Sequence, residues 1–185
     1  LECHPLVRDL DDCVREARKN MQSKTALLEA RLVWGDARLY EQMRIVLQDR
    51  CIQGHEDAYI EDRLKDQEQR RAKWGHSSFL LEPNVKSGCG GTRDFQSLKW
   101  MARVKHGVEG IASLVALGKL SESDAKQLEQ AYDFLLKVRN EMHYQQDRRN
   151  DVLMRALQPS VALHLGYTDR SLASRVSKFM ETYYR

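Results

Sequence analysis

The residues best suited to chemistry in this sequence lie in one glycine-rich stretch. Gly88, Gly90 and Gly91 stand just before an expected helix. Glycines let backbone amides approach a ligand closely, and helix amino termini attract anions. Lys86 and Arg93 flank the glycines, and both side chains can bind phosphate oxygens. The stretch therefore predicts a phosphate or nucleotide site.

The same stretch carries further polar side chains, and an alternative stays open. Glu82 and Asp94 add carboxylates near the glycines, and Asn84 adds an amide. The residue order is not G-x-x-x-x-G-K-[ST], the order of a phosphate-binding P-loop, and no strand of parallel-sheet type precedes it. The alternative is a tight turn whose arginine and aspartate satisfy the loop internally.

Arg139 and His143 form a second candidate site. They lie four residues apart on the longest expected helix and therefore share one face of it. The pair resembles the Arg-Asn…His motif of helical HEPN-type ribonucleases, with a shorter gap between arginine and histidine than that family usually shows. The alternative is a half-buried histidine held by a helix neighbour.

Other patterns predict no catalytic residue and no metal site made by this chain alone. Asp9-Leu10-Asp11 has the D-x-D form that binds Mg²⁺ in nucleotidyltransferases, but helix capping explains Asp9. His55-Glu56 lacks a second histidine at zinc-protease spacing. The remaining histidines have no ligand partner at a recognisable spacing: His4, His76, His106 and His164.

Composition narrows the class of protein. The net charge is +3 and 31% of the 185 residues are charged, with basic and acidic residues mixed along the chain. This mixture argues against a nucleic-acid partner. No apolar run approaches the ~18 residues of a membrane span. The spacing of Cys3, Cys13, Cys51 and Cys89 indicates reduced thiols and a cytoplasmic location. The start at Leu1 suggests a piece of a longer polypeptide.

Apolar periodicity predicts an all-α fold. Asp9, Asp36 and Ser121 are expected helix caps, while glycines and Gln158-Pro159 mark other boundaries. Phe79-Leu80-Leu81 could form a short extended piece. The predicted apolar stripe of the second helix is Leu39, Met43 and Val46, and that of the third helix is Ala58, Ile60 and Leu64. The expected helices span about 10–34, 37–53, 56–73, 92 onward, 110–117, 122 onward, 158–165 and 172–183.

The sequence around the glycines resembles a family signature. Residues 82–96, Glu-Pro-Asn-Val-Lys-Ser-Gly-Cys-Gly-Gly-Thr-Arg-Asp-Phe-Gln, are similar to E-P-[ND]-[IV]-K-x-x-x-G-G-[LT]-R-D-[IF] of protein-PII uridylyltransferases, the bifunctional enzymes of nitrogen control. Ordered matches also occur at 7–13, 25–36, 98–103, 158–167 and 179–184. The related glutamine synthetase adenylyltransferases share only the central K-x-G-x-G-G-x-R-[DE]. Departures include His4-Pro5-Leu6, where Gly-His-Ser is usual.

The resemblance implies a fold and a domain organisation. Residues 1–185 are expected to be a single helical domain of the nucleotidyltransferase-associated, substrate-binding or HEPN-like type, with one irregular Gly-rich loop. Its parts would be N-terminal helices at 1–75, the signature loop at 76–91 and C-terminal helices at 92–185.

The resemblance also implies a function. The parent enzyme would transfer UMP from UTP, with Mg²⁺, to a tyrosine of a PII-type protein. Its metal-binding core would precede Leu1, so this chain alone is expected to be neither catalytic nor cofactor-binding. It would line the UTP and acceptor cleft through Glu82, Asn84, Lys86, Gly88, Gly90, Gly91, Arg93 and Asp94, with Arg139 and His143 as support. A non-catalytic docking module and a HEPN-like ribonuclease are the alternatives.

Overall fold

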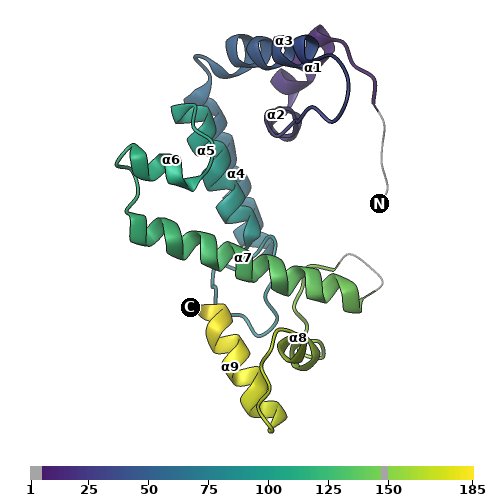
Figure 1. Cartoon of the computed structure of the whole chain (residues 1–185), viewed down its shortest axis with the longest axis vertical. Helices are drawn as coiled ribbons and strands as arrows, with labels where there is room; N and C mark the ends of the chain where they lie inside the picture. The colour runs from purple at the N-terminus through teal and green to yellow at the C-terminus, as the bar shows by residue number, and fades with distance from the viewer. Residues whose placement is uncertain (1–5, 147–149) are drawn as a thin grey trace. The chain divides into compact units, whose positions relative to one another are not determined.

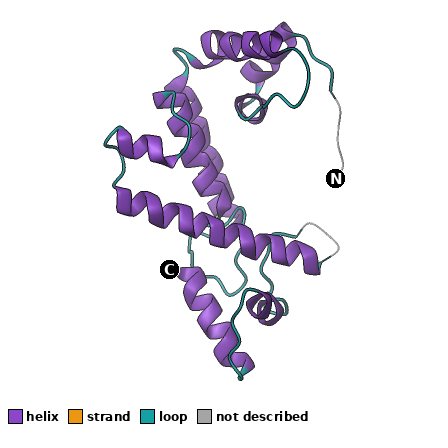
Figure 2. Ribbon diagram, in the orientation of Figure 1, coloured by secondary structure: helices purple, strands orange, loops and turns teal. Residues whose placement is uncertain are grey.

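The computed structural model describes residues 6–146 and 150–185, and its regular elements are helices (Figure 2). Within these residues the only strand-like pairing is one isolated antiparallel bridge, between Asn84 and Val152. The all-α prediction is confirmed there. Cys3 and His4 lie outside the described residues. The elements are α1 Leu10–Lys19, α2 Met21–Leu28, α3 Ala37–Leu47, the π-helical turn η1 Gln48–Ile52, α4 Glu56–Trp74, α5 Thr92–His106, α6 Ile111–Ala116, α7 Glu122–Gln145, α8 Gln158–His164 and α9 Leu172–Tyr184 (Figure 1).

The helices form two compact units, which are described separately. The first contains Leu1–Leu64 and Val104–Gly107, and the second contains Lys65–Arg103 and Val108–Arg185. The boundary falls inside α4 and again inside α5. The division into segments 1–75, 76–91 and 92–185 stays a prediction.

The first unit has its core where α1 packs against α2, α3 and η1. Val14 and Ala17 of α1 are buried with Leu47 and Cys51. Asp9 caps α1 as predicted, because its carboxylate accepts the Asp12 amide at 2.7 Å. Among the described cysteines, Cys13, Cys51 and Cys89 are free thiols.

The single helix predicted for 10–34 is wrong, because the chain breaks it at Asn20. Asn20 adopts an extended backbone (φ −150°, ψ 149°), and its side chain accepts the Ser23 amide at 2.7 Å. Asparagine competes with the helix in this way because its short amide reaches nearby backbone groups. The periodicity of the apolar residues continues across such a break, so the sequence pattern did not reveal it.

Two predicted apolar stripes are only partly correct. Met43 and Val46 of α3 pack on the first core, but Leu39 is exposed. In α4, Leu64 is exposed and the buried residues are Tyr59 and Arg63. Tyrosine and arginine carry polar groups, so a search for apolar periodicity does not identify the helix face that they bury.

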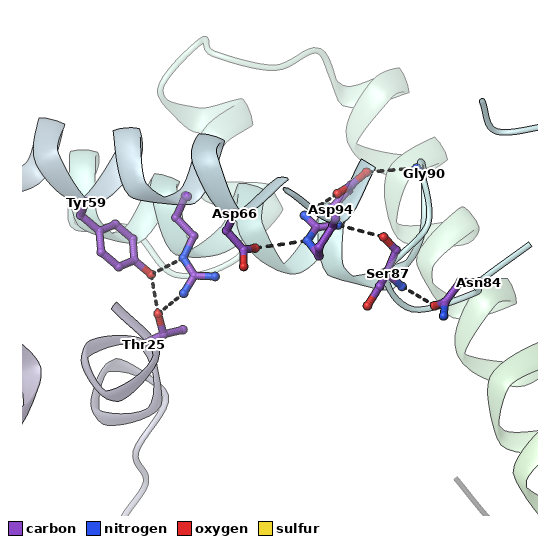
Figure 3. A network of polar contacts seen from close by, with 9 residues as sticks. Thr25, Tyr59, Asp66, Asn84, Ser87, Gly90 and Asp94 are labelled. Carbon is purple, nitrogen blue, oxygen red and sulfur yellow. Dashed lines mark hydrogen bonds and ion pairs between the residues drawn. The ribbon is translucent and has the colours of Figure 1, made fainter. Parts of the chain in front are cut away.

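A polar network explains the burial of Arg63 in the first unit. Thr25 and Tyr59 share a hydrogen bond of 2.9 Å between their hydroxyl groups. Arg63 donates to both hydroxyls, through Nε to Tyr59 at 3.2 Å and through Nη2 to Thr25 (Figure 3). Its guanidinium also lies over the Tyr59 ring, 5.4 Å from the centroid. These contacts join α2 to the first half of α4.

Two apolar clusters lie among the described residues of the second unit. The larger one buries Val138 and Met142 of α7 against Val161 of α8 and Phe179 of α9, with Val85 in the same cluster. In the smaller one, Ala102, Ile111, Leu114 and Ala125 pack together from α5, α6 and α7. Helix α7, the longest element in Figure 1, therefore contributes to both clusters.

The helix boundaries in the second unit follow the predicted signals. Ser121 caps α7 by accepting the Asp124 amide at 3.0 Å. Gly118 and Gly166 follow α6 and α8 with φ of 65° and 91°.

The predicted extended piece at 79–81 does not form a strand. No helix in the described parts of the chain is long and apolar enough to cross a membrane.

Phe179→Ala should lower the free energy of unfolding by about 3–5 kcal/mol, because it leaves a cavity at a fully buried position of the larger cluster. Chemical denaturation followed by circular dichroism measures this. Leu172→Ala on the same helix is the control, since Leu172 is 59% exposed, and it should cost under about 1 kcal/mol. Equal losses in the two variants would contradict the assigned core.

Candidate functional site

The stretch 82–95, here the signature segment, begins as a series of tight turns built around Asn84. The Asn84 side-chain oxygen accepts the amides of Lys86 and Ser87 at 3.1 and 2.7 Å. Its backbone oxygen accepts the Gly88 amide at 2.9 Å. An asparagine side chain that bonds its own following backbone is a common way to stabilise a turn. Asn84 is buried, so these bonds also satisfy groups that water does not reach.

Close backbone packing explains the glycines at positions 88 and 91. A Cβ atom at Gly88 would lie 2.6 Å from the Asn84 carbonyl oxygen. At Gly91 it would lie 2.8 Å from the carbonyl oxygens of both Lys86 and Val85. These approaches let the segment close, with Thr92 donating its amide to Val85 at 2.9 Å. Larger residues at these two positions would force the backbone apart.

The amides that were predicted to meet a phosphate have internal acceptors. The Gly90 amide donates to Asp94 Oδ2 at 3.0 Å, and the Gly91 amide donates to the Gly88 carbonyl at 3.0 Å. The Arg93 amide donates to the Lys86 carbonyl at 2.9 Å. A ligand at these amides would have to replace existing hydrogen bonds. Their phosphate-binding role stays a prediction.

Arg70 of α4 links the segment to its own helix through Asp66, Ser87 and Asp94, which Figure 3 labels. Its guanidinium donates to Asp94 Oδ1 at 2.8 Å, to Asp66 at 3.2 Å and to the Ser87 carbonyl at 3.3 Å. The Arg70 side chain is 12% exposed, so the ion pair with Asp94 is shielded from water. Asp94 thereby connects Arg70 to the Gly90 amide, and the start of α5 is held by charge as well as by backbone bonds.

A second chain segment pairs with the signature segment. The Val85 amide donates to the Asp151 carbonyl at 2.8 Å, and the Leu153 amide donates to the Pro83 carbonyl at 2.9 Å. These two bonds flank the Asn84–Val152 bridge. Pairing of this kind fixes which way neighbouring side chains point. It places the Asp151 side chain where α7 can reach it.

Arg139, His143 and Lys86 meet at the Asp151 carboxylate, and this group is here named the basic cluster. Asp151 Oδ1 accepts from Arg139 Nε at 2.7 Å and lies 3.0 Å from His143 Nε2. The Lys86 ammonium nitrogen lies 4.0 Å from Asp151 Oδ2. Two of the predicted supporting residues are therefore joined to one predicted cleft residue through an aspartate.

The charges around Asp151 decide its protonation. Burial alone would raise the pKa of this carboxyl, but the hydrogen bond and charge of Arg139 act in the opposite direction. The hydrogen bond from His143 and the charge of Lys86 add to that effect, and the pKa is held below its ordinary value. Asp151 is therefore an anion at neutral pH, and it orients the basic side chains around it.

Glu82 and Arg93 make contacts with residues outside the basic cluster. The exposed Glu82 carboxylate accepts the Arg155 amide at 2.8 Å. The Arg93 guanidinium lies over the Trp100 ring, 5.2 Å from its centroid. Cys89 and Gly90 line an open groove of about 790 Å³ with residues of α7 and the end of α9. Of the predicted cleft residues, only Lys86 therefore has an ion pair within the basic cluster.

The described residues contain no cluster of side chains of the kind that holds a metal ion by itself. Magnesium binds oxygen ligands, chiefly carboxylates. Within 6–146 and 150–185 no three His, Cys, Asp or Glu side chains come close enough together to hold a metal ion.

Sequence reasoning missed Arg70 and Asp151. Arg70 lies in the polar second half of α4, where no spacing rule singles out one charge among many. Asp151 precedes an apolar run, Val152-Leu153, and its partners lie 12 and 8 residues earlier on α7. The apolar run itself is the one local signal that a segment here packs against the core.

Comparison with known proteins gives a consistent result. The family model described as GlnD PII-uridylyltransferase matches residues 58–185. Three relatives are each named bifunctional uridylyltransferase/uridylyl-removing enzyme. They come from Rhodospirillum rubrum (38% identity over 177 residues), Azospirillum brasilense (34% over 178) and Erythrobacter litoralis (36% over 177). Each alignment covers 96% of this chain and 19% of the relative. No solved structure matches.

Asp151→Asn should lower the free energy of unfolding at neutral pH by about 1–3 kcal/mol, because it removes the charge that Arg139 and His143 contact. The pKa of Asp151 is lowered in the folded state. Its contribution is therefore complete above the ordinary aspartate pKa and is lost as pH falls through the lowered value. Urea denaturation at neutral and acid pH should show the difference between wild type and variant shrinking in acid.

The matched control is Asp133→Asn, at an exposed position of α7. Its unfolding free energy should stay within about 0.5 kcal/mol of wild type at both pH values. A difference for Asp151→Asn that is independent of pH would contradict the assignment.

Proposed function

The chain belongs to the PII-uridylyltransferase family, and we propose that it is the helical domain that helps form the cleft for UTP and the acceptor protein. The reaction would transfer UMP to a regulatory protein of the PII type in nitrogen control. The chain spans about a fifth of the length of its curated relatives, and in this proposal catalysis requires the longer polypeptide. Its fold would be of the substrate-binding, HEPN-like type that accompanies nucleotidyltransferases.

The observation that supports this role is the internal order of the signature segment. Ten residues without helix or strand are held by Asn84, by Arg70 through Asp94, and by pairing with 151–153. Such order costs conformational entropy. It also presents Lys86 beside two further basic groups in a fixed position. Fixed positive charges are what binding a nucleotide's phosphates requires.

In this proposal the metal chemistry lies outside the chain. A nucleotidyltransferase core would supply Mg²⁺, which stabilises the attacking and leaving oxygens. This chain would contribute binding and orientation. Lys86 would attract the phosphates, Arg93 would extend the positive surface from the start of α5, and Asp94 would keep that helix start in place through Arg70.

Protein docking is a second candidate role, and one observation favours it. Phe79 and Leu81 are 70% and 74% exposed just before the signature segment. Large apolar side chains that are exposed close together mark protein interaction sites. The ribonuclease alternative has no comparable observation in its favour among the described residues.

Arg93→Ala and Lys86→Gln, made in a polypeptide that joins this chain to an upstream nucleotidyltransferase core, should weaken UTP binding and slow UMP transfer by about tenfold or more each, since each removes a charge-assisted contact. Isothermal titration with UTP and Mg²⁺ and a PII uridylylation assay measure the two effects. Lys99→Ala, at an exposed position of α5, is the control and should leave both unchanged.

Unchanged UTP affinity and transfer rate in both variants would contradict the phosphate role and leave docking as the better account. RNA cleavage by the 185-residue chain that disappears in His143→Ala would instead support the ribonuclease alternative.

A further inference from the structure

The basic cluster has more positive charge than its single carboxylate neutralises. Arg139 and Lys86 are both cationic at neutral pH, and Asp151 supplies one negative charge, which leaves an excess of one. Within the described residues, no carboxylate other than Asp151 forms an ion pair with these three side chains.

The nearest acidic residue on α7 is committed elsewhere. Glu141 lies between Arg139 and His143 in sequence, but its carboxylate contacts Gln145 at 2.7 Å and His164 at 2.5 Å. The hydrogen bond from Gln145, followed by that from His164, holds the pKa of Glu141 below its ordinary value. Glu141 therefore belongs to a separate contact between α7 and α8.

The cluster also has hydrogen-bond donors left over. Arg139 uses Nε on Asp151, and its two Nη nitrogens form the fork that suits phosphate oxygens. Lys86 lies 4.0 Å from Asp151, beyond hydrogen-bond distance, so its ammonium donors can serve a ligand. The side chains of Arg139, His143 and Lys86 are 27%, 26% and 35% exposed. They are accessible yet partly shielded, which strengthens their interaction with an anion.

The arrangement is fixed before any ligand arrives. Arg139 and His143 lie one turn apart on α7, and the buried Val138 and Met142 beside them anchor that part of the helix in the larger apolar cluster. Asp151 is held through its backbone carbonyl by Val85, and Lys86 is the next residue of the signature segment. Little ordering would be needed on binding, which favours affinity.

We infer that Arg139, Lys86 and His143 form a binding site for a phosphate group of a small ligand, with Asp151 as the residue that positions them. The inference rests on the proposed function for the identity of that ligand, whose phosphates would belong to the nucleotide or to released pyrophosphate. It adds α7 to the phosphate-binding surface and gives Asp151 a role that no sequence motif indicated.

The test is a titration of the 185-residue chain with inorganic phosphate, pyrophosphate and UTP at constant pH and ionic strength. NMR of the histidine ring nitrogens reports on the site, with His143→Gln identifying the resonance. We expect a saturable shift of the His143 signal with pyrophosphate, and competition between pyrophosphate and UTP. Absence of a saturable shift, or binding of UTP with no binding of pyrophosphate, would overturn the inference.

Variants distinguish a specific phosphate site from non-specific electrostatic attraction. Arg139→Gln should weaken pyrophosphate binding by about tenfold or more, and Arg139→Lys, which keeps the charge but not the fork, should weaken it less. Lys137→Gln removes one charge from an exposed position of the same helix and should change binding little. Equal weakening in Arg139→Gln and Lys137→Gln would show general attraction only and overturn the inference.

The two proposals fail differently. Absence of pyrophosphate binding to the chain, together with normal effects of Arg93→Ala on UMP transfer in the joined polypeptide, would overturn the inference and leave the proposed function standing. Pyrophosphate binding to the chain, with no UMP transfer by the joined polypeptide, would overturn the proposed function and uphold the phosphate site.

Discussion

The constraint on which the second unit depends is that residues 82–91 bury backbone without forming helix or strand. Buried amides and carbonyls need partners, and an unmade hydrogen bond costs about 1–3 kcal/mol. Asn84 supplies two acceptor contacts from one side-chain oxygen, and Gly88 and Gly91 allow carbonyls to approach closely enough to complete the rest. The glycines of the signature therefore have a structural requirement, whatever else they do.

That local requirement has consequences at longer range. The turns leave the Val85 amide to pair with the Asp151 carbonyl, and the side chain of Asp151 meets Arg139 and His143 of α7. On the other side, Asp94 joins Arg70 to the Gly90 amide. Two carboxylates thus link one irregular segment to α4 and α7. Asp94 and Asp151 are both partly buried, and each therefore has its own fixed set of partners.

The sequence indicated elements better than it indicated their contacts. Asp9, Asp36 and Ser121 cap the helices they were expected to cap, since capping is local and depends on a few adjacent residues. The break at Asn20 was missed because the spacing of the apolar residues continues unchanged across it. Arg63 was missed because its acceptors, Thr25 and Tyr59, are hydroxyl groups with no charge pattern to follow.

In the candidate site too, the sequence indicated individual residues better than the contacts between them. The signature residues could be found from their order, and Arg139 with His143 from their spacing on one helix. Asp151, which brings them together, depends on a backbone pairing between residues more than sixty positions apart, and no local pattern encodes that distance. The proposed reaction is inferred from family membership, and the proposed site is inferred from the geometry.

Amide hydrogen exchange tests the central claim, which is that the signature segment is an ordered structural unit and not an open loop. The Val85, Thr92 and Arg93 amides all donate to backbone carbonyls within the second unit. They should exchange as slowly as amides in the interior of α5, because opening them requires the segment and its partners to separate. Exchange as fast as that of the irregular stretch 76–79 would contradict the account.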